Sequence, residues 1–356
     1  MRLEDFVRPD VYNLSMYNVK KIPPRGINLH LNENYFVSHF MVNKLLRGVC
    51  RDIDVRLYPQ PFSSSAVKSI STFLGFSEEE VAVGNGADDV LDLIMKVFLK
   101  TTSKVLVVEP TFPMYTYFLQ LYGGKKVEVL LKPNFALDVE EILKNDDVSL
   151  LFLCSPNNPT GNQYKKDDVR QLLQEFNGIV VVDETYVDFA KYTLIDWVRD
   201  FPNLIVVRSF SKSFGLAGTR FGFLVADKTI VEYIKRVTPP FNVNVVTHQL
   251  VSRALDNWPY FEKQIVDVKK ERQWLEHHLR KVDGIIPYPS ETNFLLFKVV
   301  NDTLPSSTVT KRLADKSILV KDRGAFPLLE NCIRVTIGTR RMNEGFLSAL
   351  KDALGE

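Results

Sequence analysis

The chain has 356 residues, 45% of them hydrophobic and 25% charged, and its 45 lysines and arginines against 43 aspartates and glutamates leave a net charge of +2. This composition is typical of a globular protein with a large core, and it excludes disordered, collagen-like and strongly basic nucleic-acid-binding chains. The three widely spaced cysteines form no CxxC pair, so we expect a cytoplasmic protein without disulfides. No apolar segment reaches the ~18 residues of a membrane helix, and the charge is balanced, so we expect neither membrane contact nor a nucleic-acid partner.

Residues 1 to about 35 are polar and contain prolines, and short apolar runs bounded by turn residues follow. The clearest runs are Val105–Val108, Leu150–Cys154, Ile179–Val182, Leu204–Val207 and Phe221–Ala226. Continuous apolar runs, without alternation, are typical of strands that helices cover on both faces. Between the runs, residues 88–99 and 167–176 carry apolar residues at three- and four-residue spacing, which predicts crossover helices. The sequence therefore predicts an α/β fold with a mainly parallel central sheet.

The pattern changes after Pro239-Pro240, where a long charged helical region is expected from about Thr247 to Val282. Beyond it lie three strand candidates, Phe294–Lys298, Ile318–Lys321 and Ile333–Ile337, and a final helix from about Asn343. We therefore predict three parts. These are an N-terminal arm over residues 1–35 that joins the small domain, a large domain over 36–240, and a small α+β domain over 241–356.

Polar side chains follow three of the apolar runs at the point where each run ends. Asn158 lies in the segment Ser155-Pro156-Asn157-Asn158-Pro159-Thr160-Gly161, Asp183-Glu184-Thr185-Tyr186 follows the next run, and Arg208-Ser209-Phe210-Ser211-Lys212 follows the third, with Arg220 eight residues on. Because ligands of open parallel sheets bind beyond the carboxyl ends of the strands, we expect these side chains to share one crevice.

A glycine turn supplies a further element of this crevice. The segment Gly84-Asn85-Gly86-Ala87-Asp88 follows a short apolar run and opens a helical pattern. Free backbone N–H groups and the positive end of a helix dipole make such a turn a site for a phosphate.

A lysine, a carboxylate and a phosphate site are what pyridoxal phosphate requires. Its carbonyl needs an amine for a Schiff base, its ring nitrogen needs an anion, and its phosphate needs an anchor. The sequence therefore predicts pyridoxal 5'-phosphate as the cofactor.

Four segments, over nearly the whole chain, resemble the fold-type I aminotransferases. They are Asn158-Pro159-Thr160-Gly161, Asp183-Glu184-Thr185-Tyr186, Ser209-Phe210-Ser211-Lys212 with Arg220, and Arg334-Val335-Thr336-Ile337-Gly338-Thr339-Arg340. Within that group the chain is most similar to the histidinol-phosphate aminotransferases, through Leu31-Asn32-Glu33-Asn34, Tyr58-Pro59, Gly84-Asn85-Gly86-Ala87-Asp88, Pro110-Thr111-Phe112 and Phe241-Asn242-Val243.

The resemblance implies a role for each residue around the cofactor ring. Lys212 is expected to bind the cofactor covalently and to move the proton during transamination, and Asp183 to pair with the ring nitrogen. Asn158 and Tyr186 are expected to hydrogen-bond the ring oxygen, and Phe112 to stack on the ring.

The resemblance also implies how the phosphate is held. The expected ligands are the amides of Ala87 and Asp88 and the side chains of Ser209, Ser211 and Arg220. Tyr58 is expected to reach the same phosphate from a neighbouring subunit, which implies a homodimer with shared active sites.

The substrate side is implied less completely. Arg334 is expected to bind the acidic end of the substrate, and Tyr17 and Asn34 to help enclose it. Where the family usually has an arginine in a Val-Arg-Asp segment, this chain has Lys321, so Lys321 or Arg323 is expected to take that place. The stacking position is also phenylalanine where many members have tyrosine. With only five histidines and no HExxH motif, no catalytic metal is expected.

We therefore predict a histidinol-phosphate:2-oxoglutarate aminotransferase of histidine biosynthesis, which works by ping-pong transamination through the Lys212 Schiff base. Two alternatives within the enzyme class stay open, an aromatic amino-acid aminotransferase and a threonine-phosphate decarboxylase. A more distant alternative is a protein that binds pyridoxal phosphate without turnover.

Overall fold

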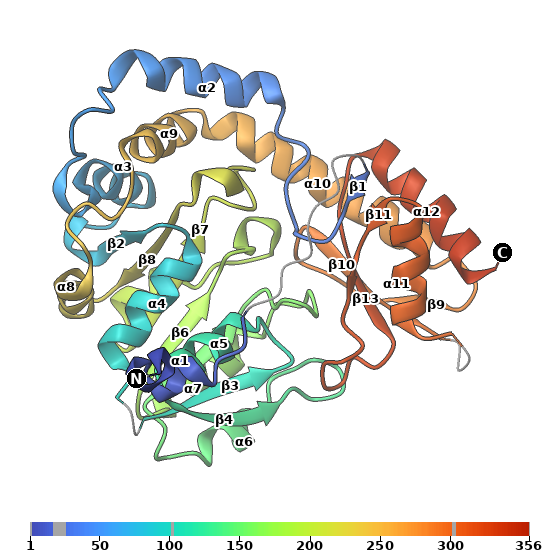
Figure 1. Ribbon diagram of the computed structural model, residues 1–356, viewed down its shortest axis with the longest axis horizontal. Coiled ribbons are helices and arrows are strands. Elements are labelled where there is room, and N and C mark those ends of the chain that lie inside the picture. The colour runs from blue at the N-terminus through green and yellow to red at the C-terminus, as the bar shows by residue number, and fades with distance from the viewer. Residues whose placement is uncertain (1, 17–25, 101–102, 301–303, 356) are drawn as a thin grey trace.

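The computed structural model describes residues 2–16, 26–100, 103–300 and 304–355, and within these ranges two units are seen. A large unit is built on a seven-stranded sheet and a smaller unit on a four-stranded sheet, and helix α10 (Trp258–Leu279) runs from the first to the second (Figure 1). The N-terminal end of the chain lies beside the large unit and the C-terminal end at the far side of the small one.

The large sheet has the strand order β2-β8-β7-β6-β5-β3-β4 within the described chain. Its strands are β2 (Val81–Gly84), β3 (Lys104–Glu109), β4 (Lys125–Leu130), β5 (Leu150–Cys154), β6 (Ile179–Asp183), β7 (Leu204–Ser209) and β8 (Gly222–Ala226). Neighbours from β4 to β7 pair in parallel, whereas β8 runs antiparallel to both β7 and β2. The predicted α/β fold with a mainly parallel sheet is confirmed. The edge strand β4 does not form a continuous apolar run, because its sequence KKVEVL carries two lysines and a glutamate and is largely exposed.

Helices cover both faces of this sheet. One face carries α4 (Ala87–Phe98), α5 (Met114–Leu121) and α8 (Lys228–Val237). The other face carries α2 (His39–Asp52), α3 (Ser64–Leu74), α6 (Val139–Leu143), α7 (Lys166–Glu175) and α9 (Val245–Asp256). Short 3-10 helices span Leu3–Phe6, Pro61–Ser63, Glu78–Glu80, Val187–Phe189, Ile195–Arg199 and Ala217–Thr219.

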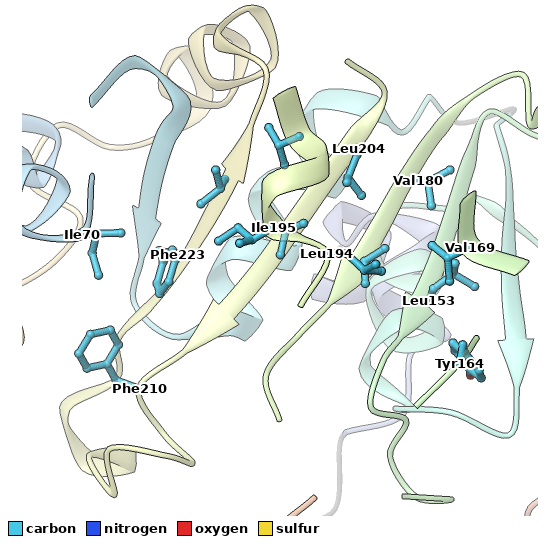
Figure 2. Packing of buried hydrophobic residues seen from close by; sticks show 14 of the residues in the cluster. Ile70, Leu153, Tyr164, Val169, Val180, Leu194, Ile195, Leu204, Phe210 and Phe223 are labelled. Atoms are coloured by element: carbon cyan, nitrogen blue, oxygen red, sulfur yellow. The ribbon is translucent and has the colours of Figure 1, made fainter. Parts of the chain in front are cut away.

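Successive residues of each strand point to opposite faces, so the continuous apolar runs fill two cores. In β5, Leu151 and Leu153 join the core beneath α3, α7 and α9, while Phe152 joins the core beneath α4 and α5. Figure 2 shows part of the first core, with Leu153 beside Val169 of α7.

The predicted long helical region after residue 240 is two helices in the structure, α9 and α10, with Asn257 between them. Pro259 stands in the first turn of α10, where its missing N–H is not needed for an intrahelical hydrogen bond. Helix α9 packs against α2 and α3, whereas α10 reaches α12 (Arg340–Leu354) in the small unit. The break therefore turns the chain from one unit toward the other.

The small sheet is antiparallel, in the order β12-β13-β10-β9. Its strands are β9 (Ile285–Pro287), β10 (Phe294–Val299), β12 (Lys321–Asp322) and β13 (Cys332–Thr336), and α11 (Ser306–Asp315) packs with α12 beside it. The predicted strand over residues 318–321 is divided: β11 (Ile318–Leu319) pairs in parallel with β1 (Ile27–Asn28), and only the part from Lys321 onward enters the sheet. Through β1 the N-terminal arm is tied to the small unit, while α1 (Pro9–Tyr12) contacts α5 of the large one.

Candidate active site

A cavity of about 240 Å³ lies at the carboxyl ends of β5, β6 and β7 and beside the first turn of α4. Ten of the predicted site residues line it, namely Ala87, Asp88, Phe112, Asn158, Asp183, Tyr186, Ser209, Ser211, Lys212 and Arg220. Five further residues that sequence reasoning did not assign also line it: Leu31, Glu33, Cys154, Thr185 and Ala217. Residues from several separate segments of the large unit thus meet in one place because parallel strands end at the same edge of the sheet.

Lys212 follows β7 and presents its amine to this cavity. Its Nζ donates a hydrogen bond to the carbonyl oxygen of Leu31 at 2.9 Å. Removal from water, and then the positive charge of Arg334, lower the pKa of Lys212 from its ordinary 10.5 to about 8. Near physiological pH, a sizeable fraction of the molecules therefore has Lys212 as a neutral, nucleophilic amine.

Asp183 ends β6 and is only 4% exposed. Its Oδ2 accepts a hydrogen bond from the Tyr115 hydroxyl at 2.8 Å and its Oδ1 accepts one from the Thr185 N–H at 2.9 Å. Burial raises the pKa of Asp183, while these hydrogen bonds act in the opposite direction. Both donors are neutral, so they do not balance the negative charge of the carboxylate. A cationic partner in the cavity would balance it, and the protonated ring nitrogen of pyridoxal phosphate is such a cation.

The opposite end of the cavity is built for an anion. The first N–H groups of α4 have no intrahelical acceptor, and Gly86 precedes them with φ +99°. Arg220 lies beside this turn, 3.3 Å from the Asp88 carboxylate. A Cβ on Gly86 would come within 2.5 Å of the Arg220 guanidinium, and one on Gly222 within 2.3 Å of the Ala87 nitrogen. Because neither glycine has a Cβ, the turn and the Arg220 guanidinium can lie close enough to bind the same ligand.

Ser209, which ends β7, and Ser211 also line the cavity. Ser209 donates through Oγ to Ser211 Oγ at 3.0 Å, and its oxygen accepts from the Ser211 N–H at 3.1 Å. Hydroxyls, a guanidinium and free N–H groups form the donor set that a phosphate requires. A lysine, a buried carboxylate and this anion site along one cavity fit pyridoxal phosphate.

Arg334 of β13 connects the small unit to Asn158, a residue of the cavity wall. Its Nη1 donates to Asn158 Oδ1 at 2.5 Å and its Nη2 donates to the His30 carbonyl oxygen at 2.6 Å. Arg334 is buried and is not itself part of the cavity wall, but Asn158, its hydrogen-bond partner, is. The contact joins the large unit, the small unit and the N-terminal arm at a single guanidinium.

The N-terminal arm contributes more than the sequence analysis assigned to it. Leu31 accepts the lysine hydrogen bond, and Asn32 donates through Nδ2 to the Tyr186 hydroxyl at 2.9 Å. Asn32 has φ +56°, a left-handed conformation that asparagine tolerates better than most residues. Burial raises the pKa of Tyr186 to about 12, so its hydroxyl stays protonated. The asparagine-rich segment around residue 32 was a visible signal, but no sequence rule identifies which of its side chains meets Tyr186.

Asn34, predicted to enclose the substrate, is not brought to the cavity wall. Its Nδ2 donates to the Ser213 carbonyl oxygen at 2.9 Å and its Oδ1 accepts from the Phe36 N–H at 3.0 Å. The first bond fastens the loop that carries Lys212 to the N-terminal arm, and the second is local to the arm. Asn34 therefore supports the lysine loop in this structure.

Three other predicted residues also lie away from the cavity. Tyr58 is 81% exposed and stacks on Phe241 at 4.6 Å between ring centroids. Lys321 stands opposite Arg334 in the β12–β13 register and lines a separate cavity of about 150 Å³. Arg323 is buried with its guanidinium 5.1 Å from the Phe326 ring. Tyr17 lies outside the described residues.

The described residues hold neither a cluster of metal ligands nor a helix suited to span a membrane. No group of three or more histidine, cysteine, aspartate or glutamate residues is placed to hold a metal ion in that part of the chain. Within the same residues, none of the helices is both long enough and apolar enough to cross a membrane.

Residues 25–350 match the family model described as aminotransferase class I and II. The chain is 33% identical over 355 residues to the histidinol-phosphate aminotransferase of Thermoanaerobacter pseudethanolicus (strain ATCC 33223 / 39E), covering 99% of both chains. It is 36% identical over 310 residues to the histidinol-phosphate aminotransferase of Christiangramia forsetii, covering 86% of this chain and 87% of that one. The crystal structure of histidinol-phosphate aminotransferase from Sinorhizobium meliloti in complex with pyridoxal-5'-phosphate has the same fold, with a TM-score of 0.89, 23% identity and 98% coverage of each chain.

Proposed function

The chain belongs to the aminotransferase class I and II family, and on that premise we propose that it transfers the amino group of histidinol phosphate to 2-oxoglutarate in histidine biosynthesis. The cofactor of these enzymes is pyridoxal 5'-phosphate. The observation that carries the proposal is the single cavity in which the Lys212 amine, the buried Asp183 carboxylate and the anion site at α4 stand together.

When bound, the cofactor supplies an electron sink for the bond that breaks at the substrate Cα. Lys212 would hold it covalently, and the low proton affinity of this amine suits it to take and return the proton at that carbon. Asp183 would stay ionised beside the ring nitrogen, because a positive partner reverses the effect of burial on its pKa. Asn158 and Tyr186 would hydrogen-bond the ring oxygen, and Phe112 would cover the ring.

The phosphate of the cofactor would be held by the anion site. Arg220 suits this role because its planar guanidinium donates two parallel hydrogen bonds to phosphate oxygens. Ser209 and Ser211, which already exchange hydrogen bonds with each other, would add two hydroxyl donors beside the Ala87 and Asp88 amides.

The guanidinium of Arg334 favours a substrate that carries an acidic group. Two of its N–H groups are fixed by Asn158 and His30, so the guanidinium keeps one orientation at the boundary of the two units. Lys321 pairs with Arg334 in the β12–β13 register and lines a separate cavity, so it would add a second cation from the neighbouring strand. Together the two cations would favour a substrate with a doubly charged phosphate over one with a carboxylate alone.

We also propose a homodimer. Val55, Leu57 and Tyr58 lie exposed in the segment between α2 and α3, and exposed apolar side chains gathered in one segment favour burial against a partner. Tyr58 would then reach the cofactor phosphate of the other subunit. Sedimentation should give the mass of two chains, and Tyr58→Phe should weaken cofactor retention while leaving the dimer intact.

For the domains we propose an arm over residues 1–35 and a boundary near Asn257 between the large and small domains. The boundary near 240 expected from the sequence would separate α9 from α2 and α3, against which it packs. The two buried cysteines, Cys154 and Cys332, are free thiols, which supports the proposal of a reducing, cytoplasmic location.

The deciding experiment compares kcat/KM for histidinol phosphate, phenylalanine and tyrosine with 2-oxoglutarate as acceptor. We expect histidinol phosphate to be preferred by at least about tenfold, since Arg334, with Lys321 on the neighbouring strand, would attract its phosphate. A preference for the aromatic acids would assign the chain to aromatic transamination, and release of carbon dioxide from threonine phosphate would assign it to the decarboxylases. Borohydride reduction of the holoprotein followed by peptide mapping should leave the label on Lys212.

A further inference from the structure

Tyr115 is a fully buried tyrosine of α5 that reaches the site from inside the protein. Its hydroxyl donates to Asp183 Oδ2 at 2.8 Å. Asp183 lines the cavity, whereas Tyr115 is not part of the wall. The hydrogen bond therefore occupies one oxygen of the carboxylate from the interior and leaves the cavity side of Asp183 for a ligand.

Two aromatic rings fix the direction of this hydroxyl. The Tyr115 ring stacks on Phe152 of β5 with centroids 5.0 Å apart and planes 16° apart. Phe112, which lines the cavity, meets it edge-on at 5.7 Å and 84°. A ring held on two sides has little freedom to swing away, so its hydroxyl is kept aimed at Asp183.

The hydroxyl keeps its proton at physiological pH. Burial, and then the negative charge of Asp183, raise the pKa of Tyr115 far above its ordinary value. A hydrogen bond donated to a carboxylate favours the ionised form of that carboxylate, which opposes the effect of burial on Asp183. The Thr185 N–H does the same at Oδ1, so both oxygens have one fixed donor.

We propose that Tyr115 is a positioning residue of the active site, which keeps the Asp183 carboxylate ionised and oriented so that its free side meets the cofactor ring nitrogen. The inference rests on the proposed function, because it concerns the same cofactor. Tyr115 would then be a residue outside the cavity that helps to determine how strongly the cofactor ring attracts electrons.

The test compares Tyr115→Phe with a matched control, Tyr164→Phe, in the full-length holoprotein. Tyr164 is also buried, but it lies on the opposite face of the sheet near Leu153 and Val169 (Figure 2), and its hydroxyl has no hydrogen-bond partner among the described residues. Each variant loses one buried hydroxyl and keeps its ring. A difference between them therefore reports the bond to Asp183 and not the loss of a buried oxygen in general.

Three quantities should change in Tyr115→Phe and stay at the wild-type value in Tyr164→Phe. The dissociation constant of pyridoxal phosphate should rise about tenfold, since a hydrogen bond to a buried charge is lost. The value of kcat should fall by a similar factor with KM nearly unchanged. The pH midpoint of the visible absorption band should rise by up to about one unit, because a less stable Asp183 anion leaves the ring less electron-withdrawing and the Lys212 nitrogen more basic.

The pH readout separates positioning from general damage. Cys154 of β5, Tyr186 after β6 and Asp88 of α4 also act on the charge of Asp183, and all three are unchanged in both variants. A shifted pH midpoint in Tyr115→Phe alone therefore reports the lost hydrogen bond to Asp183.

A double variant tests whether the tyrosine acts through the carboxylate. Adding Tyr115→Phe to Asp183→Asn should have little further effect on cofactor binding, because the carboxylate on which the tyrosine acts is already gone.

The outcomes distinguish this inference from the proposed function. If wild type, Tyr115→Phe and Tyr164→Phe share one dissociation constant and one pH midpoint, Tyr115 has no positioning role, although the enzyme remains a transaminase. A full additional effect of Tyr115→Phe on top of Asp183→Asn would also overturn the inference. Absence of a cofactor band in the wild-type protein, by contrast, would contradict the proposed function itself.

Discussion

The cofactor side and the substrate side of the cavity are held together in different ways. On the cofactor side, Asp183 ends β6 and Lys212 follows the adjacent parallel strand β7, and the pairing of the two strands fixes their spacing. On the substrate side, Arg334 donates to His30, a residue 304 positions away in the chain, and to Asn158, 176 positions away. The first arrangement is a property of one sheet, and the second exists only when two units and the arm have met.

This difference suggests how the site responds to change. The cofactor side belongs to a sheet whose strands are buried on both faces, so it should keep its geometry when a single side chain is altered. The substrate side depends on a few hydrogen bonds between units, so it should transmit a change at one residue to the others. Four experiments test this contrast.

The largest effect is expected from Lys212→Ala. Removing the amine should lower kcat by about 10⁴-fold or more, because the side chain is both the nucleophile and the group that moves the proton. The thermal midpoint should stay near that of the wild type, since β7 and its packing are unchanged. Steady-state kinetics and calorimetry check the two statements, and a large loss of stability would show that the cofactor side is less rigid than we infer.

Arg334→Lys addresses the substrate side. A lysine keeps the charge but cannot donate to Asn158 and His30 in one plane, so about 2–3 kcal/mol of interaction should be lost and kcat/KM for histidinol phosphate should fall about 30- to 150-fold. Cofactor affinity should change much less. Equal losses of cofactor affinity and of kcat/KM would mean that a change on the substrate side also disturbs the cofactor side.

The pH dependence of cofactor attachment links the two sides. Attachment requires the neutral amine of Lys212, whose pKa is about 8, so the attachment rate should rise about tenfold per unit below that pH and level off above it. Because Arg334 contributes to lowering this pKa, Arg334→Gln should move the midpoint upward. Stopped-flow absorbance against pH measures both, and a rate that climbs steadily toward pH 10 in the wild type would exclude a depressed pKa.

The smallest effect is expected from Asn34→Ala. Loss of its hydrogen bonds to Ser213 and Phe36 should cost about 1 kcal/mol of stability and lower kcat a few-fold by loosening the lysine loop. The value of KM should remain near the wild-type one. A rise confined to KM would instead support the role of Asn34 in substrate binding that the sequence predicted.

Much of the cofactor side could be predicted because its residues carry local signals. Asn158, Asp183 and Lys212 each follow an apolar run that predicts a strand, and Gly86 marks the start of α4. Tyr115 carries no such signal. It stands in the first turn of a mostly apolar helix, and its bond to Asp183 spans 68 positions of the chain.

The sequence by itself determined the class of fold, the cofactor and the residues at the strand ends, because continuous apolar runs, glycine turns and strand-end polar residues act over a few positions and leave a readable pattern. Tertiary structure alone decided that α9 belongs with α2 and α3, that the arm brings Leu31 to Lys212 and Asn32 to Tyr186, and that Asn34 supports a loop. These contacts join residues far apart in the chain through single hydrogen bonds or packed faces. Whether such a contact forms depends on where every intervening element packs, which no local pattern records.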